Sequence, residues 1–174
     1  MSEKSLKTGR YILGLYLLIG GLISLYFVLT ELGVFGFLYS LLPAIVTVVV
    51  ISFFILAGSK YAFSRSKSGV TMMKASLWIQ AVQLVFLGLG FKNYFGPYIA
   101  IGFTDTPDLK FQLLFEPFTY WFANGLNKLS DEVSIVFNLV AMSLLFLVYW
   151  IEKKETKIAS EIDEFELDYK PKAK

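Results

Sequence analysis

Residues 94–129 read YFGPYIAIGFTDTPDLKFQLLFEPFTYWFANGLNKL, and the rest of the chain is organised around this stretch. It is rich in aromatic residues, and prolines and glycines interrupt it too often for a helix that crosses a membrane. Long apolar runs and charged flanks lie on both sides of it. We therefore expect an ordered segment that connects membrane-spanning helices.

The composition indicates a membrane protein. Of the 174 residues, 56% are hydrophobic and 17% are aromatic, and the mean hydropathy is +0.61. A soluble domain of this size rarely carries such long apolar runs. The chain has no Cys and no His, which excludes disulfides, thiol chemistry and Cys/His metal sites.

Four apolar segments predict four transmembrane helices, and hence an all-α membrane protein. A helix of about 20 residues crosses the hydrocarbon core of about 30 Å. The four predicted spans cover residues 11–30, 37–57, 72–91 and 133–151. The second is rich in β-branched residues, but a bilayer requires each spanning backbone to satisfy its own hydrogen bonds, which favours a helix.

Lys and Arg residues predict the orientation. Residues 1–10 form a short basic tail with three of them, the connector 58–74 has four, and residues 152–174 have six. Residues 92–132 have three, outnumbered by five acids. The positive-inside rule places both termini and the connector in the cytoplasm, with an extracytoplasmic loop over residues 92–132. Three helices thus occupy residues 11–91, the fourth occupies 133–151, and a cytoplasmic helical extension with an acidic tail follows.

The extracytoplasmic loop is expected to hold a β-hairpin and a short helix. Two strand-like runs, 98–103 and 109–115, flank the turn sequence TDTPD. Residues 117–129 are expected to form an interfacial helix with aromatic side chains at headgroup depth. The aromatic residues either cap the helix bundle or form a recognition or oligomer surface. The candidate contact residues are Phe111, Phe115, Phe118, Tyr120, Trp121 and Phe122.

Three amide side chains are the candidate polar groups inside the membrane. Gln80 and Gln83 are three residues apart, which would place them on one helix face, and Asn138 lies in the fourth predicted span. They either join helices by hydrogen bonds or line a pore formed by several copies. None of them titrates, so ion-coupled transport and enzyme chemistry are not expected. No cofactor is expected.

Small residues in the first predicted span allow close helix contact. Gly14 and Gly21 share a helix face, and Gly20 with Ser24 forms a second small pair. These residues serve either packing within one protomer or a contact between subunits.

The C-terminal tail is a candidate partner-binding segment. The fourth helix is expected to continue to about Ser160, and acidic residues then alternate with apolar ones. Such a segment either docks on a basic partner or remains a solvated tail. The candidate partner-binding residues are Ile162, Asp163, Glu164, Phe165, Glu166, Leu167 and Tyr169. The basic connector is expected to contact lipid headgroups, and no direct binding to nucleic acid is expected.

The layout resembles the KwaA-like membrane subunits of the Kiwa anti-phage defence system. The outer stretch Phe95–Phe122 and the tail Ser160–Tyr169 carry the resemblance. It implies a bacterial inner-membrane homo-oligomer that senses phage attack and works with a cytosolic DNA-binding partner.

Two functions therefore remain open. The first is a non-enzymatic inner-membrane scaffold or sensor that oligomerises and recruits a cytosolic protein, with a place in antiviral defence. The alternative is a homo-oligomeric channel or transport component.

Overall fold

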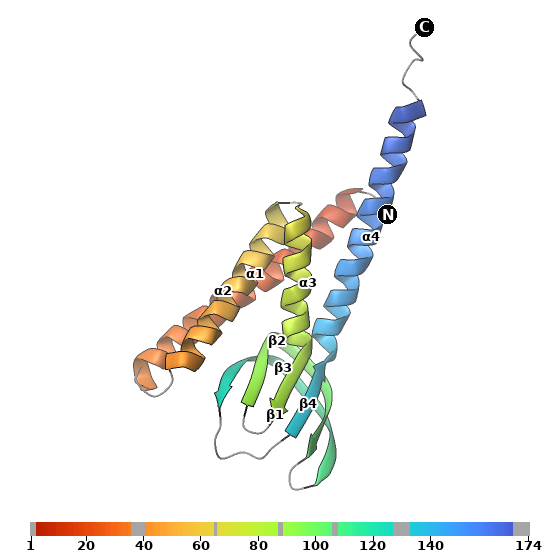
Figure 1. Ribbon diagram of the computed structural model, residues 1–174. Helices are drawn as coiled ribbons and strands as arrows, with labels where there is room; N and C mark the ends of the chain where they lie inside the picture. Colours follow the sequence, from red (N-terminus) through yellow and green to blue (C-terminus); the bar gives the residue numbers. More distant parts are fainter. Residues whose placement is uncertain are drawn as a thin grey trace.

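The computed structural model describes residues 3–35, 41–64, 66–86, 89–105, 108–126 and 133–168. Within these ranges, helices form one end of the molecule and strands the other (Figure 1). The elements are, in chain order, α1 (Glu3–Phe35), α2 (Leu41–Phe63), α3 (Lys67–Ala81), β1 (Val82–Phe86), β2 (Leu89–Asp105), β3 (Leu109–Leu126), β4 (Val133–Asn138) and α4 (Leu139–Asp168).

The prediction of an all-α protein with four membrane-spanning helices is wrong. The third predicted span is helical only to Ala81 and continues as β1 and the start of β2. The fourth begins with strand β4 before α4 starts at Leu139. Antiparallel pairing between β1 and β4 satisfies the backbone of both segments, so neither needs to be helical.

Two helices in the described part of the chain are long and apolar enough to cross a membrane. They cover Glu3–Thr30 in α1 and Ala44–Phe63 in α2. In the most apolar stretches of these two helices, only 28% and 33% of the residues are buried within the protein. The core helix of a soluble protein is mostly buried. The exposed apolar side chains of both helices therefore need an apolar environment.

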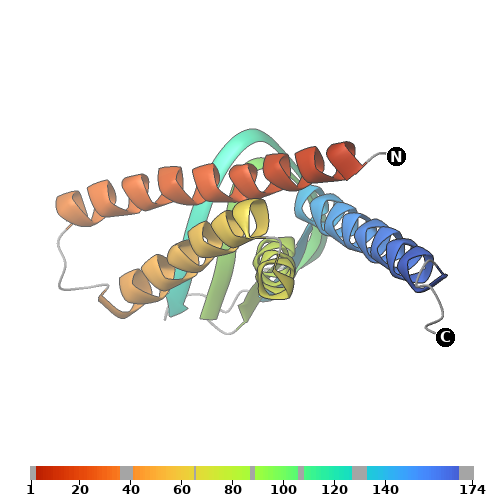
Figure 2. The ribbon, with the colours of Figure 1, turned by 90° about the horizontal axis from the view of Figure 1, so that it is seen from above.

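The four strands form one antiparallel sheet that curls back on itself. The order is β1-β4-β2-β3, and β1 also pairs with the start of β2 through Leu84 and Phe91. This double pairing requires β2 to bend, and the bend coincides with a register shift between Gly96 and Tyr98. Gly96 has a φ of 96°, a left-handed conformation that other residues rarely adopt. Figures 1 and 2 show the curled sheet beneath the helices.

The predicted hairpin is present, but the predicted interfacial helix is wrong. β2 and β3 pair from Asp105↔Leu109 back to Leu89↔Leu126, so the hairpin is much longer than the runs 98–103 and 109–115. The aromatic segment after Pro117 continues β3 as a strand. Aromatic and β-branched residues predominate in residues 118–122, and both kinds favour strands.

The glycines of α1 pack within one protomer. A Cβ at Gly14 would lie 2.7 Å from the Gly58 carbonyl oxygen of α2, and a Cβ at Gly21 would lie 2.7 Å from Cγ1 of Ile55. Gly20 lies directly under the ring of Phe95, and the Ser24 hydroxyl donates a hydrogen bond to the Gly20 carbonyl. The interpretation as intramolecular packing therefore accounts for all three glycines.

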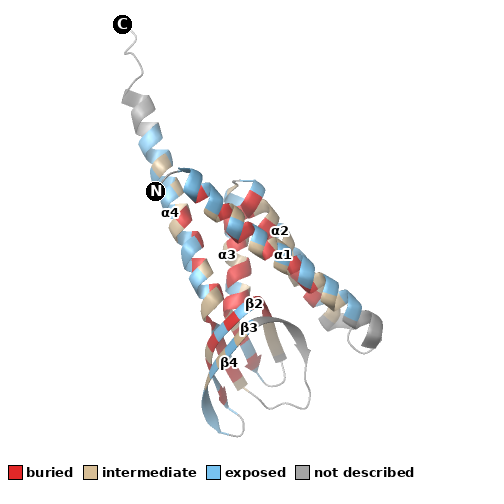
Figure 3. Ribbon diagram, turned by 180° about the vertical axis from the view of Figure 1, so that it is seen from behind, coloured by how far each residue is buried: buried red, intermediate tan, exposed pale blue. Residues whose placement is uncertain are grey.

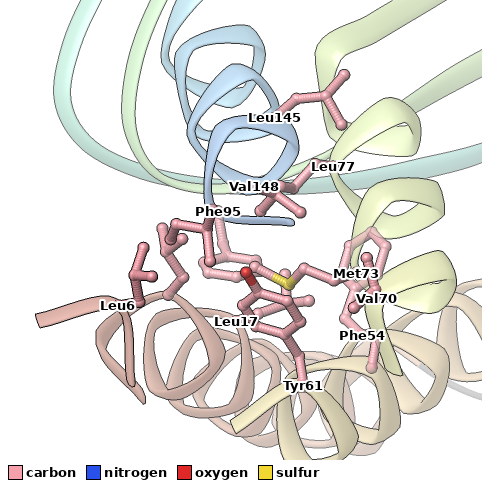
Figure 4. Close-up of a cluster of buried hydrophobic side chains, with 13 residues drawn as sticks. Leu6, Leu17, Phe54, Tyr61, Val70, Met73, Leu77, Phe95, Leu145 and Val148 are labelled. Carbon is pink, nitrogen blue, oxygen red and sulfur yellow. The ribbon is translucent and has the colours of Figure 1, made fainter. Parts of the chain in front are cut away.

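One hydrophobic cluster joins all four helices to the sheet. Leu17, Phe54 and Met73 are fully buried in it, and Phe95 inserts from the bend of β2 (Figure 4). Val148 places α4 in the same cluster. The sheet is thus fixed to the helices at the bend, while its outer end projects beyond them (Figure 1).

Candidate interaction surfaces

One face of the sheet is apolar and exposed. The strand register places alternate residues of all four strands on this face, for example Leu84 opposite Ile135 and Phe103 opposite both Ile135 and Phe111. Leu113 and Phe115 are 68% and 70% exposed. We call this the outer sheet face, and it consists of Leu84, Phe86, Ile99, Phe103, Leu109, Phe111, Leu113, Phe115, Ile135 and Phe137.

The opposite face of the sheet is buried and more polar. Tyr98 and Gln83 meet there, and the Tyr98 hydroxyl donates a hydrogen bond of 3.0 Å to Gln83 Oε1. Burial raises the pKa of Tyr98 to about 12, so the hydroxyl keeps its proton at physiological pH. Thr104 and Ser134 are also buried on this face, opposite each other on β2 and β4.

The sheet therefore carries apolar side chains on both faces, because Tyr94, Ala100 and Val136 pack with Tyr98 on the buried face. An antiparallel sheet with one wet face normally exposes polar side chains on that face. Apolar side chains on an exposed face are typical of sheets that face lipid. Large exposed apolar patches also mark contacts with other proteins. The exposed lower end of the sheet is visible in Figure 3.

The bend of β2 lies against the middle of α1. The Tyr16 hydroxyl donates a hydrogen bond of 2.9 Å to the Phe95 carbonyl oxygen, and the two rings are 5.2 Å apart. Both Tyr16 and Gly20 lie well inside the apolar span Glu3–Thr30. If α1 crosses a membrane, the sheet thus begins at the depth of the bilayer interior and leads outward.

The predicted outer contact residues all belong to β3. Phe111 and Phe115 are exposed on the outer sheet face. The side chains of the other four lie outside the described residues. Their backbones pair with the first half of β2 or lie at the register shift, and the four are Phe118, Tyr120, Trp121 and Phe122. Two of the six predicted contact residues thus lie on the outer sheet face, and the residues that β1, β2 and β4 contribute to this face were not predicted.

The three predicted intramembrane amides are buried inside the protomer. Gln80 lies in the last turn of α3 and Gln83 lies in β1, so they do not share a helix face as predicted. They are 1% and 3% exposed, and no described group bonds to the Nε2 atom of either one. Asn138 Oδ1 accepts hydrogen bonds from the backbone N–H groups of Val140 and Ala141, at 3.0 and 3.3 Å. Asn138 is therefore the N-cap of α4.

Replacing Asn138 with alanine should loosen the junction between β4 and α4. The variant loses the acceptor for two helix N–H groups, which typically lowers the free energy of unfolding by about 1 kcal/mol. Thermal unfolding of the purified protein measures this change. Asn138→Asp keeps the acceptor and serves as the control, and equal losses in the two variants would exclude the capping role.

Two ion pairs that the sequence did not reveal hold α4 against the other helices. Arg10, whose side chain is 5% exposed, pairs with Glu155 at 2.9 Å and donates a second hydrogen bond to the Tyr61 carbonyl oxygen. Lys74 of α3 pairs with Glu152. Because Glu152 and Glu155 are three residues apart, they share one side of α4. The sequence contained one signal for these pairs. Glu152 and Glu155 follow an apolar run at helical spacing, and Arg10 and Lys74 each lie next to an apolar run.

The predicted partner-binding residues lie at the far end of α4. The helix was expected to end near Ser160 but continues to Asp168. Ile162 is 52% exposed. Asp163, Glu164, Phe165, Glu166 and Leu167 belong to the helix with side chains outside the described residues, and Tyr169 is not described at all.

Among the described residues, no group of three or more acidic side chains could hold a metal ion. The surfaces that the structure offers are thus an apolar sheet face at one end and the charged end of α4 at the other. No protein-family model, curated protein or solved structure matches this chain.

Proposed function

We propose that this chain is a non-enzymatic, multi-pass protein of the bacterial inner membrane that oligomerises, senses contact outside the membrane and recruits a cytosolic protein. One observation carries the proposal. α4 begins where β4 of the apolar sheet ends, and it continues unbroken to Asp168 at the opposite end of the molecule (Figure 1). A displacement of the sheet can therefore reach the cytoplasmic end through a single helix.

The distribution of charge supports this orientation. The start of α1, the connection between α2 and α3, and the second half of α4 lie together at one end (Figure 1). The ion pairs of Arg10 and Lys74 are at this end. These parts belong to residues 1–10, 58–74 and 152–174, which hold three, four and six Lys or Arg residues and which the positive-inside rule assigns to the cytoplasm. The outer sheet face then lies on the opposite side.

The outer sheet face supports a role in contact. Its apolar side chains are favourable only against lipid or another protein, since exposure of such a patch to water is unfavourable. A second copy of the chain can cover it, which supports oligomerisation. An arriving protein or a disturbed membrane would compete for the same surface, which supports a sensing role.

The resemblance to the Kiwa membrane subunits supplies a biological setting for the proposal. A bacterial membrane protein with an apolar outer surface and an inner docking helix suits the detection of a phage at the cell surface. We therefore include antiviral defence in the proposed function. The placement of Gln80 and Gln83 inside the protomer gives no support to the channel alternative, because a pore between copies would need them on an exposed face.

Deletion of Ser160–Lys174 tests the recruitment. The chain carries an affinity tag at its N-terminus, and it is purified from its native host with and without the tail. We expect a cytosolic protein to co-purify with the full chain and to be lost from the deletion variant. The double variant Phe111→Ser, Phe115→Ser changes only the outer sheet face and should keep the partner.

Two results would contradict the recruitment role. One is a full chain that purifies without any stoichiometric partner. The other is a deletion variant that retains the partner in full. Ion flux through liposomes containing the Gln80→Leu, Gln83→Leu variant tests the channel alternative, and we expect no flux above that of protein-free liposomes from either this variant or the original chain.

A further inference from the structure

α4 carries a row of residues that starts in the core and then leaves it. Ile151, Glu155, Ile158 and Ile162 follow one another at spacings of four, three and four residues, which is the heptad spacing of a helix that packs along another helix. Ile151 is 2% exposed, Ile158 is half-buried, and Ile162 is 52% exposed. The next position of the row is 165, which is also apolar and lies in the described helix.

A groove opens where this row leaves the core. It lies between the first turns of α1 and the second half of α4 and has a volume of about 290 Å³. Apolar side chains from both helices line it, together with the ion pair of Arg10 and Glu155. Arg10 Nε is buried there and bonds to no described group. The lining residues are Glu3, Leu6, Arg10, Glu155, Ile158, Ala159 and Ile162.

We propose that this groove and the exposed row together bind one amphipathic helix of the cytosolic partner, with apolar residues at heptad positions and basic residues on both flanks. The row would pack along the incoming helix as Ile158 already packs against the cluster that contains Leu6. Helix-in-groove binding places three or four apolar anchors in such a track. This inference rests on the proposed function and specifies the partner's contact segment.

The acidic residues around the row favour a binding partner with basic residues. Residues 161–168 contain five acidic residues and neither Lys nor Arg. A second copy of α4 would bring like charges together along both flanks, which destabilises helix pairs. An anionic membrane surface would repel the same segment. A helix with basic flanks is the occupant whose charges are complementary on both sides.

A designed peptide tests the proposal on the full chain. The probe is a fluorescein-labelled helical peptide about three heptads long, with Leu at positions a and d and Lys at e and g. The full chain is reconstituted in nanodiscs of neutral phosphatidylcholine, so that the lipid does not attract the peptide. Fluorescence anisotropy measures binding. We expect the basic peptide to bind and a matched peptide with Glu in place of Lys to bind at least tenfold more weakly.

Two acidic substitutions separate packing from simple charge attraction. Ile162→Asp adds a negative charge but removes an apolar anchor. We expect about a tenfold loss of affinity for the basic peptide, because burial of one aliphatic side chain typically contributes that much to binding. Ser160→Asp adds the same charge at an exposed position on the side of the helix away from the row, so binding should stay within about twofold. Ile162 is half exposed, so its replacement leaves the fold intact.

Several outcomes would overturn the proposal. The first is that the basic peptide does not bind the original chain, the second is that it binds the Ile162→Asp variant more tightly than the original chain, and the third is that both variants lose the same amount of affinity for it. Binding that arises only after removal of residues 169–174 would show that the chain's own basic tail occupies the groove. If the peptide fails but deletion of Ser160–Lys174 still removes the native partner, the groove is excluded while recruitment stands.

Discussion

Replacing Glu155 with alanine is expected to lower the free energy of unfolding by about 2 kcal/mol, less than for a fully buried ion pair because the Glu155 side chain is 30% exposed. The loss arises from Arg10, whose side chain is only 5% exposed and would lose its carboxylate partner. The hydrogen bond to the Tyr61 carbonyl and the contact with the Tyr61 ring, 4.8 Å from Arg10 Cζ, compensate in part. Thermal and denaturant unfolding of the purified chain measure the change.

A second acid on the same helix provides the matched control. Glu161 pairs with Lys157 at 3.5 Å, but both side chains are more than 60% exposed. Exposed pairs of this kind typically contribute less than about 0.5 kcal/mol, so Glu161→Ala should unfold as the original chain does. Similar losses in the two variants would show that the buried position of Arg10 does not matter. α4 should also separate from α1 in Glu155→Ala, which spin labels on the two helices can detect.

Replacing Gly14 with alanine is expected to lower the free energy of unfolding by about 1–3 kcal/mol, as for an added methyl group in a packed core. The new Cβ would lie 2.7 Å from the Gly58 carbonyl oxygen and 2.8 Å from the Ala62 backbone nitrogen. Backbone atoms cannot move aside as a flexible side chain can, so α1 and α2 must separate. Alanine is the better helix former by about 1 kcal/mol, which reduces the net loss.

Gly9 on the same helix provides the control for this effect. A Cβ at Gly9 would lie 3.2 Å from Cδ1 of Ile151, the mobile end of a side chain. Gly9→Ala is therefore expected to be neutral or to stabilise the chain by up to about 1 kcal/mol through helix propensity. Thermal unfolding of both variants in the same detergent compares them. A stabilised Gly14→Ala variant would contradict the close approach of α1 and α2.

Parts of this fold follow directly from the sequence. The turn TDTPD between two apolar runs predicted the hairpin of β2 and β3, because Pro and Asp favour a turn at that place. The β-branched run in residues 44–56 would suggest a strand in water, yet it is helical in α2, as expected for a segment in an apolar environment. The packing role of Gly14 was one of two interpretations, and only the position of α2 decided between them.

The strands beside α3 and α4 were missed for a physical reason. The exposed positions of β1 and β4 hold apolar residues where a sheet in water would hold polar ones. In the sequence, both strands therefore resemble the ends of membrane spans. The remaining signal has a period of two: Ser134, Val136 and Asn138 are buried, and the residues between them are not. Such short alternation is weak evidence unless the pairing strand is known.

The candidate surfaces could be predicted only in part. The aromatic residues of β3 indicated one edge of the outer sheet face, but the other three strands join it only through the curled pairing. The acidic tail predicted a docking segment, which stays a prediction, whereas the groove depends on the approach of α1 to α4 through Arg10. Contacts between residues 145 positions apart have no local signal in the sequence.

The central claim is that the sheet and the end of α4 lie on opposite sides of a membrane, and labelling of single cysteines tests it most directly. The chain has no Cys of its own, so Asp108→Cys in the hairpin and Ser160→Cys in α4 each provide one thiol at an exposed position. Spheroplasts are treated with a membrane-impermeant maleimide before and after permeabilisation. We expect Asp108→Cys to react in intact spheroplasts and Ser160→Cys only after permeabilisation. Equal reaction of both thiols before permeabilisation would contradict the claim.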